Sequence, residues 1–193
     1  MKKICAYTLS VIMLLTSLLS FNTAFGAAST IRSTYDLTNA FANGGSYTLA
    51  ADVNVPSTEI TRDIEISGSG YKLRNSAHDT PATLYQNSYV ASKFTGVAIS
   101  GGSKQDVGIW LGAGSMTFTD CTMTSYRISS GRYAALAAAG SSTVTLNNTS
   151  FTGNKEYDLY LTDNVSLNLN GTSSVDKVYA ETNFVKFNLG ADW

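Results

Sequence analysis

The chain has 193 residues, of which 44% are hydrophobic and 14% charged, and its formal net charge is −1. This length is enough for one domain with a buried core. The nearly balanced charge supplies no basic surface, which excludes a typical nucleic-acid-binding protein.

Residues 1–26 have the pattern of a secretory signal peptide. Lys2 and Lys3 give a positively charged start, the run Ile12–Leu19 is mostly apolar, and small residues suit cleavage at Ala24-Phe25-Gly26. The apolar run is too short for a stable membrane span, and no later segment is long and apolar enough for one. We therefore expect the protein to be secreted, to the extracellular space or the cell surface of a bacterium.

The chain without this leader has 11 basic and 14 acidic side chains, a net charge of −3. Cys5 belongs to the leader, so Cys121 is the single remaining cysteine. We expect Cys121 to be a small buried side chain, because free cysteine packs well in cores.

A short helix is predicted within residues 27–45. Ser33 can cap its start, with Asp36 three residues later, and Gly44-Gly45 can end it. The apolar residues that share one face of this helix are Leu37, Ala40 and Phe41. An amphipathic helix at this place would cover the open end of the domain that follows, in residues 46–193.

Five short apolar segments of that domain end in the same way. Each has a large apolar anchor, then a small polar residue, then Gly, Asp or Asn. The anchors are Ile66, Phe94, Phe118, Leu146 and Leu169, which recur after 28, 24, 28 and 23 residues. The turn residues are Gly68, Gly96, Asp120, Asn148 and Gly171. Because these residue types tolerate a left-handed backbone, the pattern predicts one tight bend in each coil of a solenoid.

Alternation around the anchors predicts which side chains point inward. The inward residues two positions before the anchors are Ile64, Ser92, Met116, Val144 and Leu167, and the outward residues between them are Glu65, Lys93, Thr117, Thr145 and Asn168. A second inward row, five residues past the anchors, is Tyr71, Ile99, Met123, Phe151 and Ser174, with Val175 beside it. Glu65 and Lys93 would then be neighbours and form a surface ion pair.

A third strand in each coil follows a loop of variable length. Its inward positions are Leu84, Ile109, Leu111, Leu136, Ala138, Leu159, Leu161, Val178 and Ala180. Its outward positions are Tyr85, Trp110, Ala137, Tyr160 and Tyr179. Stacked coils would place each set in a row, and a last rung from Phe184 to Leu189 would follow, with Trp193 over part of the exposed end.

The segments SYTLAADVNV, DIEISGSGYKL, FTDCTMTS and LNNTSFTGN resemble those of right-handed parallel β-helices, a superfamily that includes pectate-lyase-like enzymes and the passenger regions of autotransporter adhesins. The resemblance implies an all-β, single-stranded, right-handed parallel β-helix (β-solenoid) of about five coils with a short N-terminal capping helix. The main alternative is an antiparallel sandwich or jelly roll, which explains alternating strands but not the recurring turn residue.

The enzymes of this superfamily pair acidic calcium ligands with an Arg or Lys base, or use clustered Asp side chains. The chain has no Trp-Ile-Asp-His, Arg-x-Pro-x-x-Arg, Asn-Thr-Asp or Gly-Asp-Asp segment, and we assign no catalytic residue. An enzyme acting on an acidic polysaccharide would use Arg127 or Arg132 as the base, with Asp106 and Asp158 as ligands of Ca²⁺. Solvated loop charges explain the same residues.

The outward aromatic row favours a different function. Flat side chains spaced along a sheet stack on sugar rings, although Tyr and Trp are also ordinary strand residues. The ligand-binding candidates are Tyr85, Trp110, Tyr160 and Tyr179. The polar row Ser67, Thr95, Thr119, Asn147 and Asn170 suggests an ice-binding face or a ladder of hydrogen bonds along the stack.

The preferred prediction is a secreted, non-catalytic, adhesin-like or carbohydrate-contacting protein without a cofactor, whose partner is a polysaccharide or cell-surface glycan. The first alternative is a polysaccharide lyase or glycoside hydrolase acting on an acidic polysaccharide. The second is a structural envelope or matrix protein, which would associate with itself through the coil ends.

Overall fold

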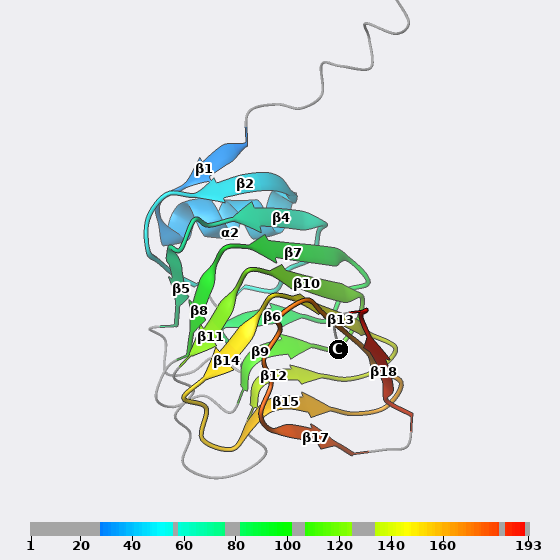
Figure 1. Ribbon diagram of the computed structural model, residues 1–193. Coiled ribbons are helices and arrows are strands. Elements are labelled where there is room, and N and C mark those ends of the chain that lie inside the picture. The colour runs from blue at the N-terminus through cyan, green and yellow to red at the C-terminus, as the bar shows by residue number, and fades with distance from the viewer. Residues whose placement is uncertain are drawn as a thin grey trace, which may run out of the picture.

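A computed structural model describes residues 28–55, 58–75, 82–101, 107–124, 134–181 and 184–191. They form a parallel β-solenoid of about five turns with one short helix near the N-terminal end (Figure 1), as the sequence predicts. The expected signal peptide and Trp193 lie outside these ranges.

The strands form three sheets, here named sheets A, B and C, and the middle coils contribute one strand to each of them. Sheet A contains β1 (Ser29–Ile31), β2 (Gly45–Leu49), β4 (Ile64–Ser67), β7 (Ala91–Thr95), β10 (Ser115–Thr119), β13 (Thr143–Asn147), β16 (Ser166–Asn170) and β18 (Lys186–Leu189). Sheet B contains β3 (Val53–Asn54), β5 (Lys72–Arg74), β8 (Ala98–Ser100), β11 (Thr122–Thr124) and β14 (Ser150–Thr152). Sheet C contains β6 (Leu84–Gln86), β9 (Val107–Leu111), β12 (Ala134–Ala138), β15 (Tyr157–Leu161) and β17 (Val178–Ala180).

Neighbouring strands in all three sheets run parallel and come from successive coils. For example, β10 pairs with β7 on one side and with β13 on the other, so that Phe118 lies between Phe94 and Leu146. The strand pairings within the described ranges contain no antiparallel pair, so the sandwich alternative is wrong.

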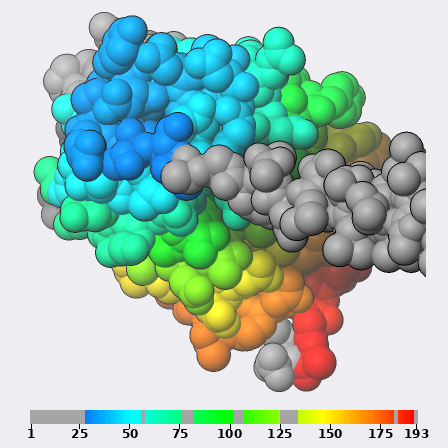
Figure 2. Space-filling model, turned by 90° about the horizontal axis from the view of Figure 1, so that it is seen from above, coloured from blue at the N-terminus to red at the C-terminus, as the bar shows by residue number. Residues whose placement is uncertain are grey.

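The helix α2 (Thr34–Asn43) closes the N-terminal end of the solenoid (Figure 1). The hydroxyl of Ser33 accepts a hydrogen bond from the backbone N–H of Asp36, and Gly44 ends the helix with a φ of 68°. The helical residues Leu37, Ala40 and Phe41 are fully buried in the core. In the view from above, this N-terminal region (blue) lies opposite the last coils, in orange and red (Figure 2). The short strand β1, which the sequence analysis did not predict, adds one more rung to sheet A at this end.

The predicted inward row of sheet A is confirmed. Ile64, Met116, Val144 and Leu167 are at most 3% exposed. Ser92, the polar member of the row, is buried beside Gln86, and its hydroxyl donates to Gln86 Oε1 at 2.6 Å. Gln86 Nε2 in turn donates to the carbonyl oxygens of Val90 and Ala113, at 2.9 and 3.0 Å. A buried polar group is costly unless it is hydrogen-bonded, and these bonds compensate both side chains.

The turn residues form the expected column at the end of sheet A. The backbone N–H groups of the first four corner residues bond to the next coil, for example Gly96 N to Thr119 O at 2.9 Å and Asp120 N to Asn147 O at 2.9 Å. The φ angles of Gly96, Asp120, Asn148 and Gly171 lie between 49° and 62°.

Gly68 belongs to this column but does not have the left-handed backbone that we expected. In its coil the positive φ angles fall on Ser69 and Gly70, at 44° and 88°. Gly68 is needed instead for space, because a Cβ there would lie 2.6 Å from the Val97 side chain. This bend is two residues longer than those of the next three coils, so the first inward residue of the following strand comes two positions later.

Two members of the second inward row are therefore corrected. Leu73, and not Tyr71, pairs with Ile99 in sheet B; Leu73 is fully buried and Tyr71 is 41% exposed. In the last coil the bridge between Ser150 and Ser174 places Val175, and not Ser174, beside the inward Phe151.

The C-terminal end also differs from the prediction. Val178 and Ala180 keep their expected register with Leu159 and Leu161 but are exposed, and so are Phe187 and Leu189 in β18. The described residues include no further coil to cover them. A side chain at an inward position of the last strand therefore stays exposed, because no further described strand covers it.

The polar row beside the corners forms a ladder of hydrogen bonds along the stack. Asn170 Nδ2 donates to Asn147 Oδ1 at 2.7 Å, and Asn147 Nδ2 donates to Thr119 Oγ1 at 3.1 Å. Two residues earlier in the strands, Asn188 Nδ2 donates to Asn168 Oδ1 at 2.7 Å, and Asn168 Nδ2 donates to Thr145 Oγ1 at 3.0 Å. The amides thus hold neighbouring coils in register.

Candidate functional site

The predicted aromatic row is present on the outer face of sheet C. The pairing of β6, β9, β12, β15 and β17 places its members in one column, and these members are Tyr85, Trp110, Ala137, Tyr160 and Tyr179. The sheet register alone brings these residues together, because outward positions on successive coils stack about 4.8 Å apart.

The interruption of this column at Ala137 coincides with a cavity of about 360 Å³, here named the β12 groove. The lining residues are Val107, Trp110, Ala137, Ala138, Ala139, Tyr160, Thr162, Asp163 and Glu181. Strand β12 has alanine at four of its five positions. Its outward Ala137 lies between Trp110 of β9 and Tyr160 of β15. The small coil is the floor of the groove and the larger neighbours are its walls. This volume lies within the range of small-ligand pockets, at its lower end.

Tyr160 forms one wall as part of an aromatic cluster. Its ring stacks on that of Tyr179, with centroids 4.8 Å apart and an angle of 9° between the planes. Tyr157 packs against both rings, with centroid distances of 6.3 Å to Tyr160 and 5.4 Å to Tyr179. Tyr160 is only 8% exposed. The packing therefore holds the Tyr160 ring in one orientation.

Trp110 forms the opposite wall, and a hydrogen bond fixes its orientation. Its Nε1 donates to Asn87 Oδ1 at 3.0 Å. Asn87 is held in turn, because its backbone N–H donates to Glu59 Oε1 at 3.0 Å and its Nδ2 donates to the hydroxyl of Tyr85. The contact requires glycine at position 112, since a Cβ there would lie 1.9 Å from Asn87 Oδ1.

Two carboxylates complete the lining. Glu181 Oε2 accepts a hydrogen bond from the hydroxyl of Tyr160 at 3.1 Å. Asp163 lies in the turn after β15, with a φ of 56°, and its Oδ2 faces the backbone N–H of Gly140 at 3.4 Å. The groove therefore combines aromatic walls and an alanine floor with acidic groups.

The four predicted ligand-binding residues divide into two pairs. Trp110 and Tyr160 line the groove, whereas Tyr85 and Tyr179 support them from the neighbouring coils. The lining residues that the sequence analysis missed are Val107, Ala139, Thr162, Asp163 and Glu181. The signal that could have found the floor is the run AALAAAG, in which small residues occupy the outward positions of one sheet C strand.

The charged candidates do not form a second site among the described residues. Asp158 is 4% exposed, and its carboxylate accepts hydrogen bonds from Asn154 Nδ2 and from the backbone N–H groups of Asp176 and Lys177, at 2.7, 2.8 and 3.2 Å. It therefore ties together two loops. Asp106, Arg127 and Arg132 lie outside the described ranges. Within those ranges, no group of three His, Cys, Asp or Glu side chains is placed to hold a metal ion.

Cys121 is buried, as the sequence predicts, and only 1% exposed. Burial raises the pKa of its thiol. A buried thiol with a raised pKa is a poor nucleophile, so Cys121 is a core residue.

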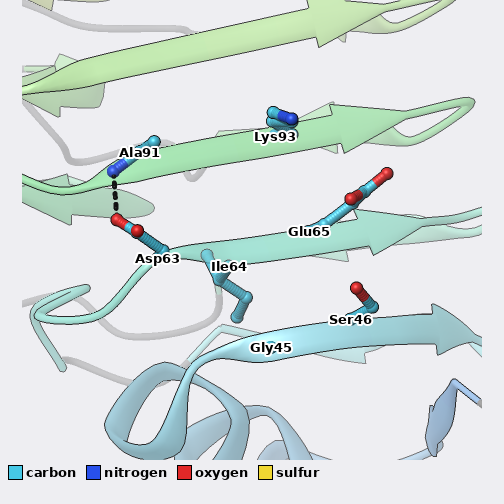
Figure 3. A pocket seen from close by; sticks show the side chains of 7 residues that line it. All are labelled: Gly45, Ser46, Asp63, Ile64, Glu65, Ala91 and Lys93. Carbon is cyan, nitrogen blue, oxygen red and sulfur yellow. Dashed lines mark hydrogen bonds between the residues drawn. The ribbon is translucent and has the colours of Figure 1, made fainter. Parts of the chain in front are cut away.

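A second, open hollow of about 240 Å³ lies on sheet A (Figure 3). Its lining residues are Gly45, Ser46, Asp63, Ile64, Glu65, Ala91 and Lys93. Asp63 Oδ1 accepts a hydrogen bond from the backbone N–H of Ala91 at 2.8 Å. Glu65 and Lys93 are paired in register, but they form no salt bridge; the one ion pair found in the described part of the chain joins Arg74 and Asp52. The hollow has no aromatic wall.

Comparison with known proteins finds no matching family model, curated protein or solved structure for this chain. In the part of the chain that the structure describes, no helix has the length and apolar character needed to cross a bilayer.

Proposed function

We propose that this protein is a secreted, non-catalytic, adhesin-like β-solenoid protein that contacts carbohydrate through the β12 groove. The observation that carries the proposal is the pairing of two aromatic walls, Trp110 and Tyr160, across a coil of alanines. The β-solenoid fold and the repeat pattern support kinship with the right-handed parallel β-helix superfamily as part of the same proposal.

The groove suits the apolar face of a sugar ring. Trp110 and Tyr160 stand two rungs apart, so their backbones are separated by about 9.6 Å, which is twice the strand spacing. A sugar presents C–H groups on one face, and aromatic rings bury such groups from water. The polar groups of Thr162, Asp163 and Glu181 are placed beside the walls to bond hydroxyls.

Both walls are set in place before a ligand arrives. Trp110 is held by Asn87, and Tyr160 is held by its stack with Tyr179 and its bond to Glu181. Ordering a side chain on binding costs about 0.5–1.5 kcal/mol, and pre-ordered walls avoid much of that loss. This fixed geometry supports a binding role for Trp110 and Tyr160.

The test is retention on insoluble glycans of the Trp110→Ala variant. We expect retention about tenfold weaker than that of the wild type, because one aromatic wall is lost, with an unchanged circular dichroism spectrum. The matched control is Tyr35→Ala on α2, which removes an aromatic side chain that is 74% exposed and remote from sheet C. Equal retention of Trp110→Ala and wild type would refute the assignment of the groove.

A further inference from the structure

We propose that two copies of this chain associate end to end through the last described rung of the solenoid, in a closed dimer whose two-fold axis passes beside Asn188 of β18. This inference goes beyond the proposed function, because it concerns assembly through a surface other than the β12 groove. The observation behind it is a group of exposed apolar side chains that continue the rows of the core.

Four large apolar side chains are exposed at this end, and together they are named here the C-terminal face: Val178, Phe184, Phe187 and Leu189. Phe187 is 49% exposed, although its partner Leu167 in β16 is fully buried. Leu189 is 60% exposed, although its partner Leu169 is only 7% exposed. The face therefore has the character of an internal layer of the solenoid, and one more layer would bury it.

The apolar area of the C-terminal face is large enough for a dimer. The exposed fractions of its four side chains lie between 42% and 65%. They correspond to about 400 Å² in each chain, at about 200 Å² for a whole phenylalanine and less for leucine and valine. Two copies would bury about 800 Å² through these side chains, and the strand edges and the polar residues around them add to this. The total then reaches the roughly 1,000 Å² expected of a specific interface.

The opposite end of the solenoid does not offer a matching surface. There α2 closes the core, and Ile31 of β1 and Phe41 of α2 are fully buried (Figure 1). Stacking head to tail would place the C-terminal face on an end whose core-facing side chains are already covered. The same end of a second copy presents an identical apolar face, and a surface that contacts itself closes a dimer.

The free edge of β18 indicates where the axis lies. The backbone N–H of Lys186 donates to Val165 O at 2.9 Å, so the even-numbered residues of β18 bond to the preceding coil. Because neighbouring residues of a strand bond to opposite sides, the backbone groups of Phe187 and Leu189 point to the free edge. These groups are available to a strand of another chain.

An antiparallel contact between two β18 strands uses these groups when Phe187 of each copy lies opposite Leu189 of the other. The two residues of each such pair exchange both backbone hydrogen bonds and keep their side chains on the core side. Asn188 then lies opposite its own counterpart, on the axis and on the outer face of sheet A. The Cα atoms of such a pair, which is not hydrogen-bonded, are about 4.5 Å apart.

The first experiment measures the oligomeric state by sedimentation velocity over a range of micromolar concentrations. We expect the wild type to be a dimer and Phe187→Ser/Leu189→Ser to raise the dissociation constant of the dimer at least about hundredfold. The circular dichroism spectrum should stay unchanged, because both side chains are already exposed in the single chain. The matched control is Tyr35→Ser/Tyr89→Ser, which removes two aromatic side chains that are 74% and 82% exposed elsewhere and should leave the dimer intact.

The second experiment tests the position of the axis by disulfide cross-linking, read by non-reducing electrophoresis. Asn188→Cys should form a disulfide between two copies, because the expected Cα separation suits that bond. Lys186→Cys is the matched control on the same strand and face. Its two copies would lie about 13 Å apart, at four residues of about 3.3 Å each, and should not cross-link. The native Cys121 is only 1% exposed and should not contribute.

These results decide the proposal independently of glycan binding, which tests the β12 groove. A wild type that stays monomeric would overturn the dimer, and assembly into filaments would overturn its closed symmetry. A dimer that persists in Phe187→Ser/Leu189→Ser would place the interface elsewhere. Absence of the Asn188→Cys cross-link, or equal cross-linking of Lys186→Cys, would refute the antiparallel contact around Asn188.

Discussion

The corner at Gly171 offers a quantitative test of how the coils stack. Gly171 has a φ of +60°, and a Cβ added there would lie 2.1 Å from Asn148 Oδ1 on the preceding coil. That oxygen accepts a hydrogen bond from the backbone N–H of Thr172 at 3.1 Å, while Asn148 Nδ2 donates to Asp120 Oδ1 at 3.1 Å. The substitution Gly171→Ala must therefore displace a side chain that joins three coils.

The expected cost has two parts. A left-handed backbone costs alanine about 1–2 kcal/mol. The unfolded chain has less conformational entropy with alanine than with glycine, which offsets about 0.4–1 kcal/mol of that cost. Displacing Asn148 removes two hydrogen bonds, worth about 0.5–1.5 kcal/mol each. Gly70→Ala is the matched control, because Gly70 also has a positive φ, of +88°, but no atom lies within 4 Å of its added Cβ. We expect Gly171→Ala to lower the free energy of unfolding by about 1–3 kcal/mol more than Gly70→Ala.

Urea-induced unfolding followed by circular dichroism measures this difference. The double variant Asn148→Gly/Gly171→Ala removes the obstructing side chain and should abolish the excess cost of alanine at position 171, as a double-mutant cycle would show. Equal destabilisation by Gly171→Ala and Gly70→Ala would refute the reasoning. An excess cost that persists in the Asn148→Gly background would show that it arises elsewhere.

Three further predictions concern the Trp110 wall, the core thiol and the helix cap. Gly112→Ala should weaken glycan retention without touching the ligand, because its Cβ displaces Asn87 and frees Trp110; a retention equal to that of wild type would contradict this. Cys121 should react with a thiol reagent only after unfolding. Because burial raises the pKa of the thiol above 9.0, its contribution to stability should be full below pH 9.0 and decline as the pH rises through the folded-state pKa. Urea titrations of Cys121→Ala should lack that alkaline decline. A hydrogen bond from the backbone N–H of Arg32 lowers the pKa of Asp36 below 3.8. The stability advantage of wild type over Asp36→Asn should therefore be present above pH 3.8 and vanish as the pH falls through the folded-state pKa. An advantage independent of pH would contradict the assignment.

The stacking of the coils could be predicted because its determinants are local. An anchor, a polar residue and a turn residue lie within three positions of one another, and alternation then fixes which neighbours face the core. The bend after β4 was mispredicted because Gly68, Ser69 and Gly70 all suit a turn. The sequence therefore does not say which of them takes the left-handed backbone or how many residues the bend contains. The wrong inward position for Tyr71 follows from that ambiguity.

The groove could be predicted only in part, for a related reason. Register placed Trp110 and Tyr160 in one column, and the alternation of sheet C is enough for that. Asp163 reaches the groove because the turn after β15 places it there, and Glu181 reaches it because its side chain is long enough to contact Tyr160. The strand pattern encodes neither. Ala137 looked like an interruption of an aromatic surface, whereas in three dimensions a small residue between two large ones makes a cavity.

The most direct test of carbohydrate binding in the β12 groove is a ¹H–¹⁵N NMR titration of the full protein with soluble oligosaccharides. We expect shifts of the indole N–H resonance of Trp110 and of the backbone amide resonances of Ala139, Thr162 and Asp163, while the resonances beside Lys93 on sheet A stay unchanged. Shifts confined to sheet A, or no shifts with any of the oligosaccharides, would contradict binding in the groove.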